Sequence, residues 1–211
     1  MTSTLPVRAP GAGGVSPIAR VSEAALRHNA PRAVGGVDDV LAADGWGHGA
    51  AWVASVLSDM GRDATGLDAA VLYGLPGSHA RPVMSLRGRA LGTKPLRKGE
   101  GVSYGYTHRA PHDTTVALVT GGYAQGVVRS LGNAVTVSID GRRHRIVGRV
   151  AMDVSVVDVD HAAVTRGAEV VFFGDPAEGH PSLAEWTDAT GWTAAEIVAA
   201  VGVRADRRVA P

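Results

Sequence analysis

Two stretches of the chain place apolar residues at helical spacing, which predicts two amphipathic helices. The first lies in residues 21–34, where Ser22 is of a type that caps helix N-termini. The second covers residues 49–60, and Gly61 follows as the residue type that most often ends a helix. The apolar positions are Val21, Ala24, Ala25, Leu26, Ala51, Val53, Ala54, Val56 and Leu57.

Short apolar runs elsewhere predict strands, most of them in the second half of the chain. The Asp140-Gly141 pair is a hairpin turn signal between two of these runs. Near the end, Ser182-x-x-Glu185 and Thr193-x-x-Glu196 have the form of capping boxes, each of which predicts a short helix. The pattern as a whole predicts a mainly β fold with some helix. The predicted strands are residues 37–42, 69–74, 84–92, 115–120, 134–139, 145–150, 154–159 and 169–173.

Composition argues against several classes of protein, among them nucleic-acid-binding, membrane-binding and disulfide-linked proteins. Of 211 residues, 45% are hydrophobic, and the formal net charge is +1, which argues against binding to nucleic acid or a membrane surface through bulk charge. The chain has no cysteine, which excludes disulfides and thiolate metal sites. Residues 1–20 read as a disordered lead-in without a signal peptide, and no later stretch is as long as a membrane helix, so we expect a cytoplasmic protein.

Lysine is scarce in this chain, and its histidines do not have the spacing of a metal site. Lys94 and Lys98 are the only lysines, and Schiff-base chemistry needs an amine that can lose its proton, which arginine cannot supply. His108 and His112 are four residues apart but flank Pro111, so they do not share a helix face. We therefore expect no metal site.

Three glycine-bordered segments carry a family resemblance. Residues 99–105 (GEGVSYG), 121–126 (GGYAQG) and 148–153 (GRVAMD) are similar to the V-S-Y-G, I-G-Y-A-D-G and G-R-x-C-M-D segments of alanine racemases. They occur in the same order and at nearly the same spacing. The resemblance covers roughly residues 81–209 and implies that residues 81–211 form an alanine-racemase C-terminal-like β domain.

The resemblance implies roles for five residues. Tyr104 matches the second acid/base of the family, a role for which a phenol is suitable because it can share its proton with a base. Tyr123 matches a residue of the active-site entrance, and Arg129 and Arg149 match arginines around it. Met152 matches the position whose backbone N–H meets the substrate carboxylate.

The cofactor side departs from the family pattern. Residues 40–49 (VLAADGWGHG) resemble the V-x-K-A-D-A-Y-G-H-G strand that carries the lysine for pyridoxal phosphate, and Ala42 stands at the position of that lysine. Trp46 replaces a tyrosine that approaches the phosphate, and Leu67 replaces the arginine that faces the pyridine nitrogen. Gln125 replaces an aspartate of the entrance. The resemblance thus implies that no cofactor-binding residue is intact, and we expect no cofactor.

The remnant of the barrel domain is short. Residues 69–74 resemble the last strand of the family's (β/α)8 barrel, yet they follow the second helix almost directly, so residues 21–80 are expected to be a truncated remnant (helix, strand, helix, strand). Two strands cannot close a barrel, and their edges and the apolar helix face at residues 51–57 would need a cover. A homodimer, or a heteromer with a full-length racemase, is the expected assembly.

Three functions are compatible with this sequence. The first is a non-catalytic family member with a binding, assembly or regulatory role. The second is an isomerase half-site donor that supplies Tyr104 in trans to a full-length racemase. The third is an enzyme with a changed ligand held near Tyr104, Arg129 and Arg149.

Overall fold

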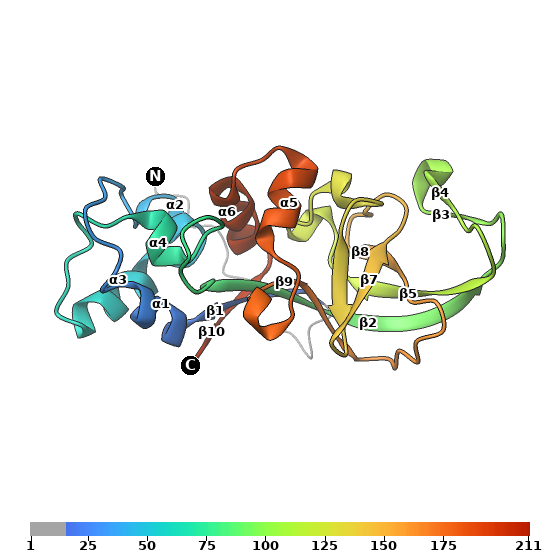
Figure 1. Cartoon of the computed structure of the whole chain (residues 1–211), viewed down its shortest axis with the longest axis horizontal. Coiled ribbons are helices and arrows are strands. Elements are labelled where there is room, and N and C mark those ends of the chain that lie inside the picture. Colours follow the sequence, from blue (N-terminus) through green and yellow to red (C-terminus); the bar gives the residue numbers. More distant parts are fainter. Residues whose placement is uncertain (1–15) are drawn as a thin grey trace, which may run out of the picture.

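The computed structural model describes residues 16–211 and is built around one long, bent sheet (Figure 1). Its strand order is β10-β1-β2-β5-β8-β7-β6-β9, and a further pairing of β2 with β9 joins six of the strands into a closed ring. The protein is therefore mainly β with some helices, as the sequence predicts. The strands are β1 (Ile18–Ser22), β2 (Met84–Leu96), β5 (Thr114–Thr120), β6 (Thr136–Ile139), β7 (Arg142–Ile146), β8 (Val154–Asp158), β9 (Glu169–Phe173) and β10 (Asp206–Ala210).

The 13-residue strand β2 connects the six-stranded barrel to the two remaining strands of the sheet, β1 and β10. Its first residues pair with β1, which runs parallel to β10, and its later residues pair with β5. The hairpin between β6 and β7 is confirmed: Ile139 pairs with Arg142, so Asp140 and Gly141 alone form the turn, both at positive φ. Because this two-residue turn starts β7 at Arg142, the predicted strand 145–150 was placed too far along the chain.

Two helices cover one side of the barrel: α5 (Leu183–Thr190) and α6 (Ala194–Arg204) (Figure 1). Both predicted capping boxes are present, with Glu185 accepting from the backbone of Ser182 and Glu196 from that of Thr193. On α5, Trp186 is fully buried and packs edge-on against Phe173 at 5.0 Å between ring centroids. These contacts fix the helices on the barrel.

The N-terminal part of the described chain is helical and lies at one end of the sheet (Figure 1). The predicted helices are confirmed: the Ser22 hydroxyl accepts from the Ala25 amide at the start of the first, and Gly61, at φ +66°, follows the second. Asn29, at the end of α1, hydrogen-bonds the backbone of Leu72 in α4 and that of Arg81, which lies three residues before β2. The helices are α1 (Glu23–Asn29), α2 (Ala42–Trp46), α3 (Ala50–Asp59) and α4 (Ala69–Tyr73).

Both strands expected in residues 21–80 are wrong. Residues 37–40 have no regular structure, and residues 69–73 form α4, with the Asp68 carboxylate accepting from the Val71 amide at 3.0 Å and Gly74 ending the helix at φ +64°. A short apolar run does not distinguish a buried helix from a strand, and the Asp68 cap was the signal that favours the helix. The parallel strand pair of a barrel remnant is therefore not formed.

Two further expectations are corrected at the N-terminus. Residues 18–20 belong to β1 and so are not part of a lead-in, while residues 1–15 lie outside the described residues. The apolar face of α3 is not open, because Val53, Val56 and Leu57 are at most 3% exposed. Their side chains share one continuous core with the barrel, and a division into two domains near residue 80 stays a prediction.

A small second sheet projects from the barrel at the end opposite the N-terminal helices (Figure 1). It consists of β3 (Gly101–Val102) and β4 (His108–Arg109), and a 3-10 turn, Tyr104–Tyr106, connects them. Within residues 16–211, every helix falls short of the length and apolarity that crossing a membrane requires.

Candidate functional site

The first motif forms the tip of the β3–β4 hairpin. The backbone has positive φ at Ser103, Gly105 and Tyr106, and a Cβ on Gly101 would lie 2.3 Å from the Tyr106 ring. The Tyr106 ring thus packs on a glycine that cannot be enlarged. Tyr104 is turned outward, with 74% of its surface exposed. The sequence did not predict that the tyrosine of this segment stands in solvent, and its catalytic role stays a prediction.

The second and third motifs contact each other directly. The amide of Tyr123 donates to the carbonyl of Ala151 at 3.0 Å, and a Cβ on Gly122 would lie 2.2 Å from the carbonyl oxygen of Met152. Gln125 reinforces this contact, since its oxygen accepts from the Gly122 amide and its Nε2 donates to Asp153. The glutamine that replaces the family's aspartate therefore keeps the turn closed. Met152 itself is 55% exposed.

Two arginines connect the three motifs. The Arg129 guanidinium stacks over the Tyr123 ring at 4.9 Å, a cation–π contact. Arg129 and Arg149 line one hollow of about 440 Å³ together with Thr107, and the Arg149 guanidinium carbon lies 3.8 Å from the point where Gly105 would carry a Cβ. Arg149 therefore sits beside the residue that follows Tyr104. We call Tyr104, Tyr123, Arg129, Arg149 and Met152 the motif face.

The two arginines of the motif face, Arg129 and Arg149, form no ion pairs with the described residues. The hollow between them also has hydrogen-bonding side chains from Thr107, Ser130 and Asn133. Guanidinium groups with neighbouring hydroxyl and amide groups are suited to hold a carboxylate. The structure thus links Tyr123, Met152 and the two arginines through contacts of their segments and places Arg149 beside the hairpin that carries Tyr104, while the roles assigned to the five residues stay predictions.

The positions matched to the cofactor side lie elsewhere. Ala42 begins α2, the Trp46 indole donates to the Asp39 carbonyl at 3.2 Å, and Leu67 is buried in the core. Both lysines are exposed: Lys94 lies on the half of β2 that pairs with β5, and Lys98 follows the end of that strand. Residues 40–49 around Ala42 contain no lysine and so present no side-chain amine.

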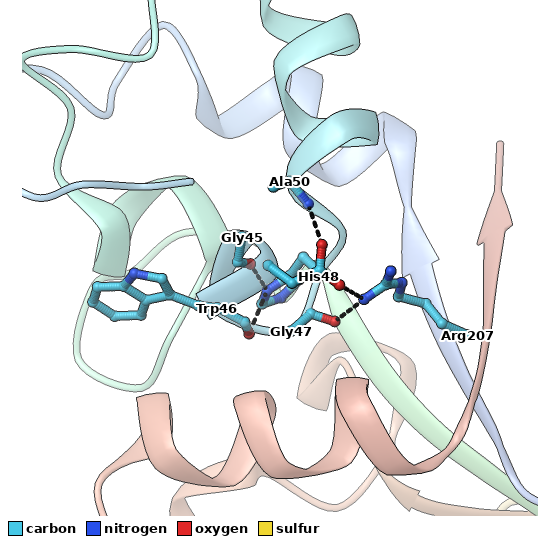
Figure 2. A network of polar contacts seen from close by, with 7 residues as sticks. Gly45, Trp46, Gly47, His48, Ala50 and Arg207 are labelled. Atoms are coloured by element: carbon cyan, nitrogen blue, oxygen red, sulfur yellow. Dashed lines mark hydrogen bonds and ion pairs between the residues drawn. The ribbon is translucent and has the colours of Figure 1, made fainter. Parts of the chain in front are cut away.

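A polar network that the sequence did not predict holds the turn between α2 and α3 (Figure 2). The Arg207 guanidinium donates to the Asp44 carboxylate at 2.7 Å and to the Gly47 carbonyl at 2.9 Å, and Asp44 also accepts from the Ala50 amide. A Cβ on Gly202 would lie 1.9 Å from the Gly47 oxygen, so the turn lies directly on α6. The arginine is 163 residues from its carboxylate partner, and no local pattern could indicate that pair.

His48 is the buried centre of this turn. Its side chain is 1% exposed, its Nδ1 lies 3.0 Å from the Gly45 carbonyl and 3.2 Å from that of Trp46, and its ring stacks on Tyr73 at 4.1 Å. Burial lowers the pKa of His48 to about 4, and the positive charge of Arg207 adds to this effect. The ring is therefore neutral at pH 7.

The short element α2 is also conformationally strained, because most of its residues form a left-handed turn and not a right-handed helix. Residues 43–47 all have positive φ, and three of them, Ala43, Asp44 and Trp46, are not glycine. A side-chain-bearing residue in this left-handed region costs about 1–2 kcal/mol. The contacts of Arg207 and the buried His48 stabilise a backbone that would otherwise be unfavourable.

Comparison with known proteins identifies the family of the chain. The model of the family described as "Alanine racemase, C-terminal domain" matches residues 83–209. The alanine racemase of Thermobifida fusca (strain YX) is 41% identical over 127 residues, which are 60% of this chain and 34% of the relative. That of Mycobacterium ulcerans (strain Agy99) is 44% identical over 119 residues, 56% of this chain and 31% of the relative. The chain thus spans about a third of the length of these curated relatives.

Solved structures agree with the sequence match. The alanine racemase from Streptomyces coelicolor A3(2) superposes with a TM-score of 0.63 at 35% identity, covering 67% of this chain and 39% of the other. The enzyme from D-cycloserine producing Streptomyces lavendulae has the same TM-score at 30% identity and covers 81% of this chain and 54% of the other. The matched motifs, the closed barrel and these superpositions agree, and the chain belongs to the alanine racemase C-terminal domain family.

Proposed function

We propose that this chain is a non-catalytic member of the alanine racemase family that acts through binding or assembly, with the motif face as its contact surface. The observation that carries the proposal is the exposure of the motif residues: Tyr104 is 74% and Met152 55% exposed, although both belong to segments that match racemases. Large exposed aromatic and arginine side chains are typical of protein interfaces. A second polypeptide would cover them.

The cofactor side supports the non-catalytic part of this proposal. Ala42 cannot form a Schiff base, and the loss of a covalent anchor removes the group through which the other catalytic residues act. Because Lys94 and Lys98 are exposed and lie toward the hairpin, neither substitutes for it. On this account the chain alone does not racemise alanine.

The composition of the motif face indicates the chemistry of the partner. Arg129 and Arg149 require acidic or carbonyl groups opposite them, and the hairpin tip offers Tyr104 for packing. A second copy of this chain and a full-length racemase are the two partners we propose, with neither nucleic acid nor membrane involved. A cytoplasmic location is part of the same proposal.

Light scattering on the purified chain tests the contact surface. If the partner is a second copy, the measured mass is twice the 21.6 kDa of one chain, and Arg149→Glu reduces it to one. The matched control is Arg142→Glu, which reverses an exposed charge on β7 outside the motif face. A dimer that Arg149→Glu leaves intact would show that the contact lies elsewhere, and a monomeric chain would leave only the full-length racemase as partner.

The half-site function is a second candidate, favoured by the outward position of Tyr104 at the tip of a projecting hairpin. A phenol in that position can enter another protein's site. The test mixes this chain with a full-length alanine racemase whose own V-S-Y-G tyrosine is replaced by alanine. Activity restored by the wild-type chain and not by Tyr104→Phe supports it, and equal results with both chains would reject it.

A further inference from the structure

A second apolar cluster lies on the face of the sheet that is turned away from the main core, against the β3–β4 hairpin. Along β5, Ala117 and Val119 belong to the main core, so the alternating residues Val116 and Leu118 lie on the opposite face. The hairpin packs on this outer face. The buried residues of the cluster are Leu96, Val102, Ala110, Val116 and Val147, each at most 5% exposed.

The hairpin covers only part of this apolar face. Val116 is 2% exposed, whereas Leu118, two residues further along β5, is 41% exposed. Leu118 pairs with Gly92 on one side and with Val156 on the other, and Val156 is half-buried. A Cβ on Gly92 would meet no atom within 4 Å apart from its chain neighbours. The apolar face therefore continues beyond the hairpin into open space.

A β-bulge in β2 shapes one side of this space. Ala90 and Gly92 pair with consecutive residues of β5, so Leu91 is an extra residue between the two pairs. Because of the bulge, Gly92 and Lys94 lie on the outer face, although Ala90 belongs to the main core. Lys94 stands directly opposite Val116. The bulge thus places an ammonium group beside the apolar cluster.

The hairpin and the sheet together form an open hollow of about 440 Å³. This volume is within the range of small-molecule sites, which begins at about 300 Å³. The five residues of the motif face are not among those that line it. Its apolar lining is aliphatic, with Val102 and Val116 buried and three further side chains open to solvent in part. These three are Leu91, Leu118 and Val156.

The charge of the hollow favours an anion. Of the described residues that line it, only Lys94 is charged, and Thr93 and Ser103 add hydroxyl groups. The exposed ammonium group of Lys94 takes part in none of the ion pairs formed within residues 16–211. A ligand with an aliphatic body and one carboxylate would match both the apolar lining and this charge.

We propose that this hollow binds a free medium-chain aliphatic carboxylate. Its chain would lie on Leu91, Leu118 and Val156, which solvent reaches in the unliganded protein, and its carboxylate would pair with Lys94. The proposal does not rest on the function proposed for the motif face.

Binding of butanoate, hexanoate, octanoate and octylammonium to the full chain at pH 7 tests this chemistry. The readout is the methyl ¹H–¹³C NMR signals of Leu118. We expect affinity to rise about two- to fourfold for each methylene from butanoate to octanoate, because each is removed from water. Octanoate should bind about two- to tenfold more tightly than octylammonium, since Lys94 attracts the one and repels the other.

Three results would overturn the proposal. The first is no movement of the Leu118 signals at millimolar octanoate. The second is binding of octylammonium as tight as that of octanoate. The third is Leu118 signals that change with the concentration of the chain and not with octanoate, which would assign the apolar face to a second copy.

Two lysine variants test the ion pair. Lys94→Gln should remove the preference for octanoate over octylammonium. The matched control is Lys98→Gln, which neutralises the other exposed lysine, outside the lining, and should leave the preference unchanged. A preference that survives Lys94→Gln would reject the assigned pair.

A filled hollow locates the bound chain. Gly92→Val adds a side chain in the open space, at a position that does not have the positive φ that favours glycine, and should weaken octanoate binding about tenfold or more. The control Arg142→Val adds the same side chain at an exposed strand position outside the lining and should leave binding unchanged. Binding that survives Gly92→Val would place octanoate elsewhere and reject the site, and the lysine variants decide the proposal even if Gly92→Val does not fold.

Discussion

The buried neutral His48 predicts a specific loss of stability in acid. In the folded protein its pKa is about 4, against an ordinary value of 6.5. Below pH 6.5 the unfolded chain binds a proton at this histidine and the folded chain does not. The free energy of unfolding therefore falls as the pH drops from about 6.5 toward 4. The difference of about 2.5 pKa units corresponds to about 3 kcal/mol, most of it lost by pH 4.

The groups around His48 also favour a lower free energy of unfolding in acid. Arg207 faces the turn and opposes a second positive charge, while the two carbonyls at Nδ1 favour protonation but do not outweigh burial. Burial alone would raise the pKa of Asp44, but the Ala50 amide and Arg207 together stabilise its carboxylate more strongly and lower that pKa. The stability that this carboxylate contributes is lost as the pH falls below 3.8, the ordinary pKa of the group. Asp44 therefore adds to the loss of stability in acid, but at a lower pH than His48 does.

Urea unfolding followed by tryptophan fluorescence at pH 7, 5.5 and 4.5 measures the effect. Between pH 7 and 4.5 the free energy of unfolding of the wild type should fall by about 2–3 kcal/mol more than that of His48→Asn, because the variant lacks the titrating group. The control His112→Asn removes an exposed histidine and should follow wild type. Equal losses for wild type and His48→Asn would refute the assignment of His48 as a buried neutral group.

Three more substitutions test the described geometry. Ala43→Gly should stabilise the protein by about 1 kcal/mol in the same urea assay, because φ at this position is +48° and glycine relieves the strain; a loss of stability would contradict the left-handed turn. Gly122→Ala should cost about 2 kcal/mol or more, since its Cβ would meet the Met152 carbonyl, whereas the control Gly92→Ala has open space and should cost far less. Tyr104→Phe should change stability by less than about 0.5 kcal/mol because the side chain is mostly exposed, and a larger change in thermal unfolding would show a packing role.

The second half of the chain was predictable because its signals are local. The Asp140-Gly141 turn, the two capping boxes and the glycine-bordered motifs each determine a structure within a few residues of themselves. Closure of the barrel was not predictable, because it depends on the pairing of β2 with β9, whose residues are 80 or so positions apart.

The strand predicted at residues 69–74 is wrong for a physical reason. Residues 69–73 are apolar enough for a buried strand, and the deciding feature is the single cap at Asp68. The partner of Asp44 lies 163 residues away, so the buried turn around His48 carried no pattern that a sequence could display. For the motif face, the sequence predicted which residues belong together, but their exposure depends on a hairpin that projects from the barrel.

We propose that this family member presents racemase motif residues on an open face without a site of its own for the chemistry. The most direct measurement is exchange of the α-proton of L-alanine for deuterium, followed by NMR with the purified chain and added pyridoxal phosphate. We expect the same slow exchange as with pyridoxal phosphate alone. Exchange that rises in proportion to the concentration of the chain, and that Tyr104→Phe abolishes, would contradict it.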